Sequence, residues 1–360
     1  MSVQHTYVIA EAGVNHNGDV ERAVCMVDAA ADAGADAVKF QTFRADEVAS
    51  ATAEKARYQK ATTGTDESQL EMLRRLELAP ADHDTIAARC RERGIEFLST
   101  AFDTLSLDML VDGLGIGRIK IPSGEITNGP LILHAASKNL PVIVSTGMAT
   151  LDEVTEALGV LAFGWTRDAV PSGRADFAES LASPHGRKRV QERVTILQCT
   201  TEYPTPFDDV NLRVMDTFRA EFGTAVGLSD HTQGIAVPIA AVALGAELIE
   251  KHFTLDRSLP GPDHAASLEP DELREMVAGI RAVERALGSG VKSPQTSEQP
   301  NRDVARRSLV AARPVAAGSH YAAADITAKR PGRGVSPMQL WALLGTAAPA
   351  DLATGEEIPE

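Results

Sequence analysis

Short apolar runs alternate with longer amphipathic stretches along most of this chain. We identify eight such runs, at 7–11, 36–41, 95–100, 118–123, 141–146, 194–199, 225–229 and 247–253. Apolar residues with helical spacing lie between them, for example at 20–33, 82–93, 151–163 and 235–244. This alternation is typical of strand–helix units around a parallel sheet. Eight units ending near residue 288 match the ~250 residues of an α/β fold of the (β/α)8 TIM-barrel type.

A doubly wound sheet is the alternative architecture for such a pattern. That fold carries a glycine-rich phosphate-binding turn directly after its first strand, and no such motif follows the first run here. We therefore predict a TIM-barrel catalytic domain over residues 1–287.

The sequence changes character after residue 287. Residues 288–302 are rich in Gly, Ser, Pro and Gln without a hydrophobic period, which is typical of a linker. Residues 303–360 resume as short strands and turns, and we predict a small β-rich domain there.

Two long connections interrupt the barrel pattern. Residues 42–79 contain a helical piece of their own at 67–76, and a loop of this length on a barrel top is typically a lid or a binding loop. Residues 164–193 are rich in Pro, Gly, Ser and Arg, and we predict a surface insertion on the opposite face.

Charge and cysteine content exclude several classes of partner. The chain has 50 acidic and 35 basic residues, a net charge of −15, which argues against nucleic acid or an anionic membrane as a partner. No apolar run is long enough to span a membrane, and the N-terminus lacks the pattern of a secretion signal. The three cysteines are far apart in the sequence, so a disulfide framework is not expected. We predict a cytoplasmic protein.

Nearly every predicted strand ends in a polar residue. These are Glu11, Lys39, Gln41, Ser99, Thr100, Lys120, Ser123, Glu125, Ser145, Thr146, Gln198, Thr200, Ser229, His231, Glu250 and His252. The active site of a TIM barrel lies at the C-terminal ends of its strands. We therefore expect these side chains to converge on one pocket.

Two of the strand-end residues are lysines, Lys39 and Lys120. A buried lysine needs a carboxylate partner or an anionic ligand. Neighbouring strand ends supply hydroxyl groups that suit a phosphate, from Thr100, Ser123, Ser145 and Ser229. A structural lysine–carboxylate network with Glu11 and Glu125 is the alternative.

Two histidines, His231 and His252, end consecutive strands and should lie side by side. With Glu11, Glu250 and Asp263 nearby, they suit a divalent metal such as Mn²⁺ or Mg²⁺ better than zinc. A hydrogen-bonded histidine pair, or a general acid or base, is the alternative.

Side-chain alternation along a strand separates these residues from their neighbours. Ser229, Asp230 and His231 contain the residue types of a hydrolase triad, but adjacent strand residues point to opposite faces and cannot form that relay. The same alternation predicts that Lys251 points away from the pocket.

Motifs spread along the chain resemble a known family. They include IAEAGVNHNG, AVKFQTF, ESQLEML, FLSTAFD, KIPSGEI, STGMAT, CTTEYPTPF, GLSDHT, IEKHFTLD, GPDHAASLEP and KRPGRGVSP. They resemble those of the sialic acid (N-acetylneuraminate) synthases, including the N,N'-diacetyllegionaminate synthases. The resemblance implies condensation of phosphoenolpyruvate with an N-acetylmannosamine-type sugar, either N-acetylmannosamine or 2,4-diacetamido-2,4,6-trideoxymannose, releasing phosphate. It also implies that residues 303–360 form an antifreeze-like SAF domain, which is swapped over the partner's active site in a homodimer.

The resemblance implies a role for each matching residue. His231 and His252 would bind the metal, and catalytic groups would come from Glu11, Lys120, Glu125 and Asp263. Phosphoenolpyruvate would be held by Lys39, Thr100, Ser123, Ser145 and Ser229. The sugar would be contacted by Glu125, Thr201, Tyr203, Glu250 and the partner subunit's Arg330. The alternatives are another phosphoenolpyruvate–aldose condensing barrel, a metal aldolase, or a glycan- or ice-binding protein that uses the SAF domain.

Overall fold

The computed structural model describes residues 5–56, 59–60, 63 and 67–359. They form two compact units, Met1–Gly288 and Ser289–Glu360, which we describe separately. Among the described residues, no helix is long and apolar enough to cross a membrane.

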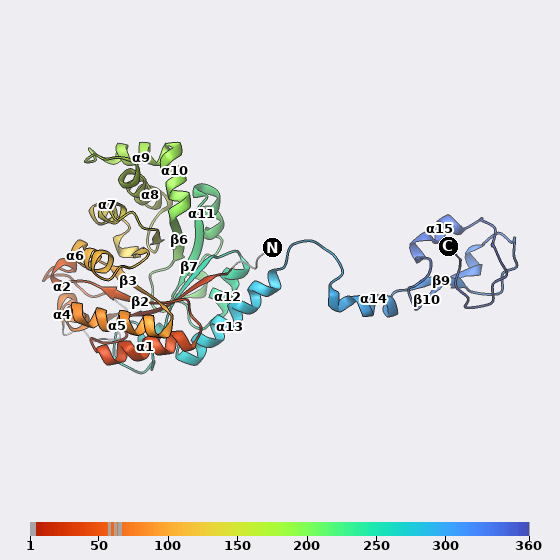
Figure 1. Cartoon of the computed structure of the whole chain (residues 1–360), viewed down its shortest axis with the longest axis horizontal. Coiled ribbons are helices and arrows are strands. Elements are labelled where there is room, and N and C mark those ends of the chain that lie inside the picture. Colours follow the sequence, from red (N-terminus) through yellow and green to blue (C-terminus); the bar gives the residue numbers. More distant parts are fainter. Residues whose placement is uncertain (1–4, 57–58, 61–62, 64–66, 360) are drawn as a thin grey trace. The chain divides into compact units, whose positions relative to one another are not determined.

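Eight parallel strands of the first unit close into a barrel in sequence order. They are β1 (Tyr7–Gly13), β2 (Ala37–Thr42), β3 (Glu96–Ala101), β4 (Ile119–Ile121), β5 (Val142–Ser145), β6 (Val194–Cys199), β7 (Ala225–Asp230) and β8 (Leu248–His252). Figure 1 shows helices surrounding these strands. The predicted TIM barrel is confirmed, and the predicted strands agree with the observed ones to within about three residues at each end.

The surrounding helices follow the strands along the chain. They are α1 (Val20–Asp32), α5 (Pro80–Arg93), α6 (Thr104–Asp108), α7 (Gly129–Ser137), α8 (Leu151–Thr166), α11 (Val214–Phe222), α12 (Ala236–Ala243) and α13 (Pro270–Leu287). Asp19 caps the N-terminus of helix α1, and its carboxylate accepts hydrogen bonds from the backbone N–H groups of Glu21 and Arg22. Such a cap satisfies donors that have no partner within the helix.

Apolar side chains fill the lower part of the barrel. They are Ile9, Ala37, Leu98, Ile143, Leu197 and Leu248, with Tyr7 packed against them. Gly227 lies in the same layer, where a Cβ atom would come within 2.8 Å of the Leu197 side chain. Because side chains alternate along a strand, the residue two positions after each of these points into the barrel one layer higher. The active-site layer therefore lies directly above an apolar floor.

The two long connections contain helices. Within 42–79 the structure describes α2 (Ala45–Val48) and α4 (Gln69–Leu76). The 164–193 segment, predicted as a surface insertion, contains α9 (Arg174–Ala182) and α10 (Pro184–Arg193). Gly159 of α8 lets α9 approach closely, since a Cβ there would lie 3.0 Å from the Phe177 carbonyl oxygen.

The second unit is small and β-rich. Strands β9 (Ser308–Ala311) and β10 (Ile326–Lys329) pair antiparallel. Its separate core includes Leu309, Tyr321 and Leu352. The predicted linker is partly helical, because α14 (Gln299–Ala305) begins inside it. Arg330 follows β10 directly and is exposed.

Candidate active site

A cavity of about 470 Å³ lies at the C-terminal ends of the barrel strands. Most residues predicted for the site line it: Glu11, Lys39, Thr100, Lys120, Ser123, Ser145, Thr201, Tyr203, Ser229, His231, Glu250, His252 and Asp263. Among the described residues, Glu125 is not part of this lining. The expected convergence on one pocket is therefore observed for most of the strand-end residues, but not for Ser99, Thr146, Gln198 and Thr200, which also lie outside this lining.

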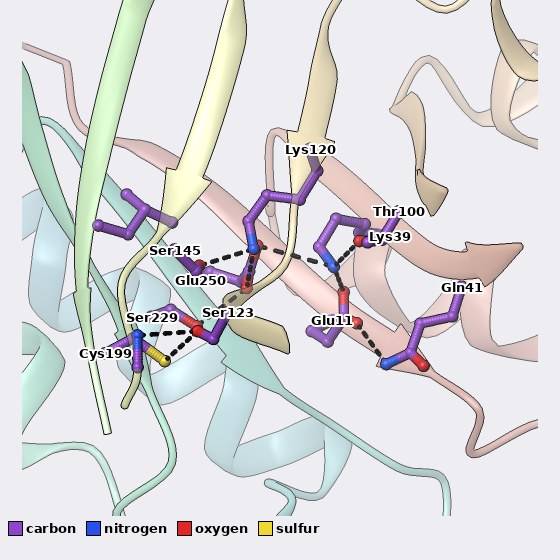
Figure 2. A network of polar contacts seen from close by, with 12 residues as sticks. Glu11, Lys39, Gln41, Thr100, Lys120, Ser123, Ser145, Cys199, Ser229 and Glu250 are labelled. Carbon is purple, nitrogen blue, oxygen red and sulfur yellow. Dashed lines mark hydrogen bonds and ion pairs between the residues drawn. The ribbon is translucent and has the colours of Figure 1, made fainter. Parts of the chain in front are cut away.

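The two lysines and two carboxylates form a buried network across the barrel (Figure 2). The Lys39 ammonium lies 2.6 Å from Glu11 Oε2, 3.7 Å from Glu250 Oε2, and donates to Thr100 Oγ1 at 2.8 Å. Lys120 donates to Ser145 Oγ at 2.7 Å and to Glu250 Oε1 at 3.2 Å. Each buried charge thus has an opposite charge beside it, which offsets the cost of removing it from water.

The two carboxylates of the network differ in their proton affinity. Burial raises the pKa of Glu11 to about 7, although the charge of Lys39 opposes the shift. Burial acts in the same direction on Glu250, but the charges of Lys120 and Lys39 outweigh it and lower the pKa to about 2. Ser229 Oγ adds a hydrogen bond to Glu250 Oε1 at 2.9 Å. Glu250 is therefore the permanent counterion that holds both ammonium groups.

Two histidines lie beside this network. The rings of His231 and His252 are 5.3 Å apart between centroids, and Tyr203 packs on His231 at 4.1 Å. His231 Nδ1 donates to the Thr200 carbonyl oxygen at 2.7 Å. Because a carbonyl oxygen only accepts, Nδ1 carries the proton and Nε2 can be left with a free lone pair. A backbone carbonyl that orients the ring in this way is common at metal-binding histidines.

The second histidine is also suited to metal binding. His252 Nδ1 is buried, has no hydrogen-bond partner among the described residues, and lies 3.8 Å from Asp263 Oδ2. Burial and the nearby His231 lower the pKa of His252 well below its ordinary value, so the ring is neutral. No group of three metal-binding side chains occurs within the described part of the chain. His231 and His252 fit a metal ion that has two protein ligands. The remaining coordination positions of that ion would be open to water or substrate.

An ion pair supports the two histidines from outside the barrel. Lys251 Nζ lies 2.6 Å from Asp230 Oδ2, donates to the Thr232 carbonyl oxygen, and is fully buried. Asp230 and Lys251 are direct partners in the β7–β8 register. Both side chains point to the outside of the barrel. In the sequence, Asp230 lies between Ser229 and His231, and Lys251 lies between Glu250 and His252, and these four neighbours line the cavity. The predicted orientation of Lys251 and the rejection of the hydrolase triad are both confirmed.

Two predicted residues, Glu125 and Glu250, have surroundings other than those expected. The Glu125 carboxylate accepts a hydrogen bond from Asn128 Nδ2 at 2.6 Å, because a short helical turn after β4 carries it away from the strand end. Glu250, a predicted sugar contact, lies between the two lysines, because it is inward-facing on β8 at the level of Ser229. Arg330 belongs to the second unit.

Comparison with known proteins identifies the family. The NeuB family model matches residues 26–292, and the SAF domain model matches residues 306–359. The chain belongs to the NeuB family. This confirms the family resemblance and the SAF prediction.

Relatives of this NeuB-family chain match it over most of its length. It is 44% identical to an N,N'-diacetyllegionaminic acid synthase of Legionella pneumophila, over 97% of this chain and 92% of the relative. It is 45% identical to one of Campylobacter jejuni, over 99% and 100%. A solved structure of the N-acetylneuraminic acid synthetase of Leptospira borgpetersenii is similar at 32% identity, with a TM-score of 0.67 over 83% of this chain and 90% of that one.

The NeuB-family site contains residues that strand-end reasoning did not single out. Gly147, two residues after the end of β5, donates its backbone N–H to Ser123 Oγ at 2.9 Å. A Cβ atom there would overlap Thr201 Oγ1 and lie 2.9 Å from Ser123 Oγ. Thr201 Oγ1 is buried and lacks a hydrogen-bond partner among the described residues. Only the glycine within STGMAT hinted at this close approach.

The close approach at Gly147 leads to a test. In the Gly147→Ala variant, the new methyl group should push Ser123 and Thr201 aside, because it would overlap their side chains. Both residues line the cavity, so neither can move without losing its place in the cavity wall. A displacement of about 1 Å can lower activity about 100-fold, and we expect a loss of this size in kcat/KM with the midpoint of thermal unfolding nearly unchanged. Gly129→Ala is the control, since a Cβ at Gly129 meets nothing within 4 Å. Equal activity of the two variants would contradict the prediction.

Proposed function

We propose that this chain condenses phosphoenolpyruvate with the open-chain form of 2,4-diacetamido-2,4,6-trideoxymannose, giving N,N'-diacetyllegionaminate and phosphate. The observation that carries the proposal is the cavity in which Lys39 and Lys120 lie beside His231 and His252. The lysines and hydroxyls suit the phosphate and carboxylate of phosphoenolpyruvate. The sugar is inferred from the names of the relatives at 44% and 45% identity.

We propose Mn²⁺ or Mg²⁺ as the cofactor, held by His231 and His252. When bound, such an ion supplies a Lewis acid that polarises the aldehyde oxygen of the sugar. The neutral ring of His252 would supply a nitrogen lone pair for this purpose, and His231 would supply the lone pair of Nε2. Tyr203 holds the ring of His231 in place through its packing.

The residues of the chain then position the reacting atoms. Lys39 and Lys120 offset the negative charge of phosphoenolpyruvate, and Thr100, Ser123, Ser145 and Ser229 orient it through hydrogen bonds. The C3 atom of phosphoenolpyruvate forms a bond to the aldehyde carbon, whose oxygen takes up a proton. Water adds at C2 and loses one proton. The C2–O bond to phosphate then breaks, and the remaining proton of the C2 hydroxyl passes to the departing phosphate as the 2-keto group forms.

A carboxylate in the cavity has to accept the proton from that water. Glu11, Glu125 and Asp263 were the candidates from sequence. Glu125 is bound to Asn128 and does not line the cavity among the described residues. We therefore assign the role to Glu11 or Asp263.

The experiment that tests the function measures phosphate release from phosphoenolpyruvate. The purified chain is given 2,4-diacetamido-2,4,6-trideoxymannose or N-acetylmannosamine, each with and without Mn²⁺. We expect release that requires both the metal and a sugar, with a higher kcat/KM for the diacetamido sugar. Absence of turnover with both sugars in the presence of metal would overturn the proposal.

We also propose that the protein acts as a homodimer in which the partner subunit's Arg330 contacts the N-acetyl group of the sugar. The proposal rests on the family resemblance and on the match of residues 306–359 to the SAF domain. Arg330→Ala should raise KM for the sugar at least about tenfold, because the loss of one charge-assisted hydrogen bond weakens binding by about this factor. The midpoint of thermal unfolding should not fall. Arg307→Ala, which removes another exposed arginine of the same unit, is the control.

Complementation separates a contact between subunits from one within a subunit. Arg330→Ala and His252→Ala proteins are unfolded together and refolded as a mixture. If Arg330 acts across the dimer, each mixed dimer contains one intact site and activity returns. If activity does not return although mixed dimers form, the arginine does not act across the dimer.

A further inference from the structure

Two asparagines of the segment after β1 reach across to the segment after β8. Asn15 is buried and Asn17 is half-buried, and they flank His16 in the sequence. The segment that they reach includes the turn formed by residues 260–264, which we call the Asp263 turn. Asp263 lines the cavity. The two segments are far apart in the sequence but meet because β1 and β8 are neighbours in the barrel.

Asn17 binds the Asp263 turn through both ends of its side-chain amide. Its Nδ2 donates to the Pro260 carbonyl oxygen at 2.8 Å. Because a carbonyl oxygen only accepts, the amide nitrogen faces Pro260, and the amide oxygen is left to face His264. His264 Nε2 lies 3.3 Å from that oxygen. One side chain thus joins the first and the last residue of the turn.

The ring of His264 is fixed by the same contacts. Since the amide oxygen of Asn17 can only accept, His264 Nε2 carries the proton. Burial lowers the pKa of His264 to about 4, so the ring is neutral and its Nδ1 has a free lone pair. Thr254 Oγ1 lies 2.7 Å from this nitrogen and donates to it. Gly261 allows this close packing, because a Cβ atom there would come 2.6 Å from His264 Cδ2.

Asn15 holds the backbone of Asp263 through a different route. Its Nδ2 donates to the Phe253 carbonyl oxygen at 2.8 Å and to Ser267 Oγ at 2.9 Å. The Ser267 hydroxyl in turn donates to the Asp263 carbonyl oxygen at 2.7 Å. The backbone around Asp263 is therefore attached to the segment after β1 by two independent sets of hydrogen bonds, one from each asparagine.

The carboxylate of Asp263 has no such attachment of its own. Among the described residues, its Oδ2 lies 3.8 Å from His252 Nδ1, and neither of its oxygens accepts a hydrogen bond. The carboxylate of Glu11, in contrast, lies 2.6 Å from the Lys39 ammonium. A carboxylate without hydrogen bonds stays where its backbone places it. The position of this group in the cavity therefore depends on the two asparagines.

From this we infer that Asn15 and Asn17 are positioning residues that hold the Asp263 carboxylate in the cavity for the reaction. The inference rests on the proposed function, because it gives Asp263 a part in that reaction. A displacement of about 1 Å can lower activity about 100-fold, so loss of one of the two attachments should lower kcat at least about tenfold. KM for phosphoenolpyruvate should hardly change, because the lysines proposed to bind it are held by Glu250 instead.

The Asn17→Gly variant removes the amide without straining the backbone. Asn17 has φ 54°, a left-handed conformation that glycine adopts readily. With phosphoenolpyruvate, the diacetamido sugar and Mn²⁺, this variant should release phosphate with a kcat at least about tenfold lower. Asn139→Gly is the matched control, because Asn139 has φ 55° and its Oδ1 accepts from Arg193 at 2.7 Å, outside the cavity. The control should keep the kcat of the unaltered protein.

Combination with Asp263→Asn separates positioning from a general structural effect. Loss of a group that transfers a proton lowers kcat about 10²- to 10⁴-fold, so phosphate release by this variant is followed over a longer time. If Asn17 acts through Asp263, Asn17→Gly should cause no further loss in the Asp263→Asn background, because the effects of coupled residues do not add. The same fold loss in both backgrounds, or no loss in the otherwise unaltered protein, overturns the inference.

A second variant guards against a folding defect in the first. Ser267→Ala removes the hydroxyl that binds the Asp263 carbonyl oxygen, and it takes the place of Asn17→Gly in the same comparison if that variant does not fold. Full activity of Asp263→Asn overturns the inference and leaves the proposed function intact, with Glu11 as the proton acceptor. If the unaltered protein releases no phosphate with either sugar, the proposed function itself fails.

Discussion

Replacing either His231 or His252 with alanine is expected to remove metal-dependent phosphate release. The two rings are neighbours in the cavity, 5.3 Å apart between centroids, so loss of one leaves a single protein ligand from the pair. A metal that polarises a carbonyl contributes several kcal/mol, and at 1.36 kcal/mol per tenfold we expect activity to fall about 10³-fold or more. Titration calorimetry with Mn²⁺ should show binding to the unaltered protein and none that saturates in either variant.

The histidine prediction has a direct control. His185 is an exposed histidine of α10, and His185→Ala should keep both Mn²⁺ affinity and activity. Full metal-dependent activity in His231→Ala or His252→Ala would rule out the proposed metal site. It would favour the alternative, in which the histidines form a hydrogen-bonded pair or act as an acid or base.

The second large effect is expected from the ion pair behind the histidines. Lys251→Met keeps the volume of the side chain but leaves the Asp230 carboxylate buried without its cation. The side chains of Lys251 and Asp230 are 0% and 1% exposed, so water cannot replace the missing cation beside the carboxylate. Breaking a buried pair in this way costs about 3–5 kcal/mol of unfolding free energy.

The measurement is urea unfolding of the barrel. The chain has two tryptophans, Trp165 in the barrel and Trp341 in the second unit, so a Trp341→Phe background makes fluorescence report on the barrel alone. Lys188→Met is the matched control, because Lys188 is 73% exposed and pairs with Glu192 at 3.7 Å. Exposed pairs of this kind contribute less than about 1 kcal/mol.

A double variant separates the loss of the pair from the burial of a lone charge. Replacing a whole buried ion pair with apolar residues is often close to neutral. Lys251→Met combined with Asp230→Leu should therefore regain most of the stability lost in the single variant. A single variant as stable as the Lys188→Met control would show that the pair does not stabilise the barrel.

Much of the site follows from the order of residues along the strands. Ile9 and Glu11, Ala37 and Lys39, and Leu248 and Glu250 are each two positions apart. A strand that places the first residue of a pair in the apolar floor places the second in the layer above. The alternation of apolar and polar residues, together with the strand–helix repeat, was therefore enough to predict the barrel, the convergence of the strand ends and the orientation of Lys251.

Residues outside the strands could not be placed in this way. Glu125 lies beyond the end of β4, where a helical turn directs its carboxylate to Asn128. Val14 and Phe102 form a hydrophobic cluster with apolar residues of α2 and α4, which depends on how these two helices pack beside the strand ends. The charged and proline-containing 164–193 segment forms α9 and α10, which the polar composition did not predict.

The sequence by itself determined the fold, the family and the set of side chains at the strand ends, because a period of two along a strand is a local property. Only the tertiary structure decided how those side chains are paired. It placed Glu250 between the two lysines and left Thr201 Oγ1 against Gly147. These features depend on distances between residues far apart in the chain, which packing sets and local sequence pattern does not.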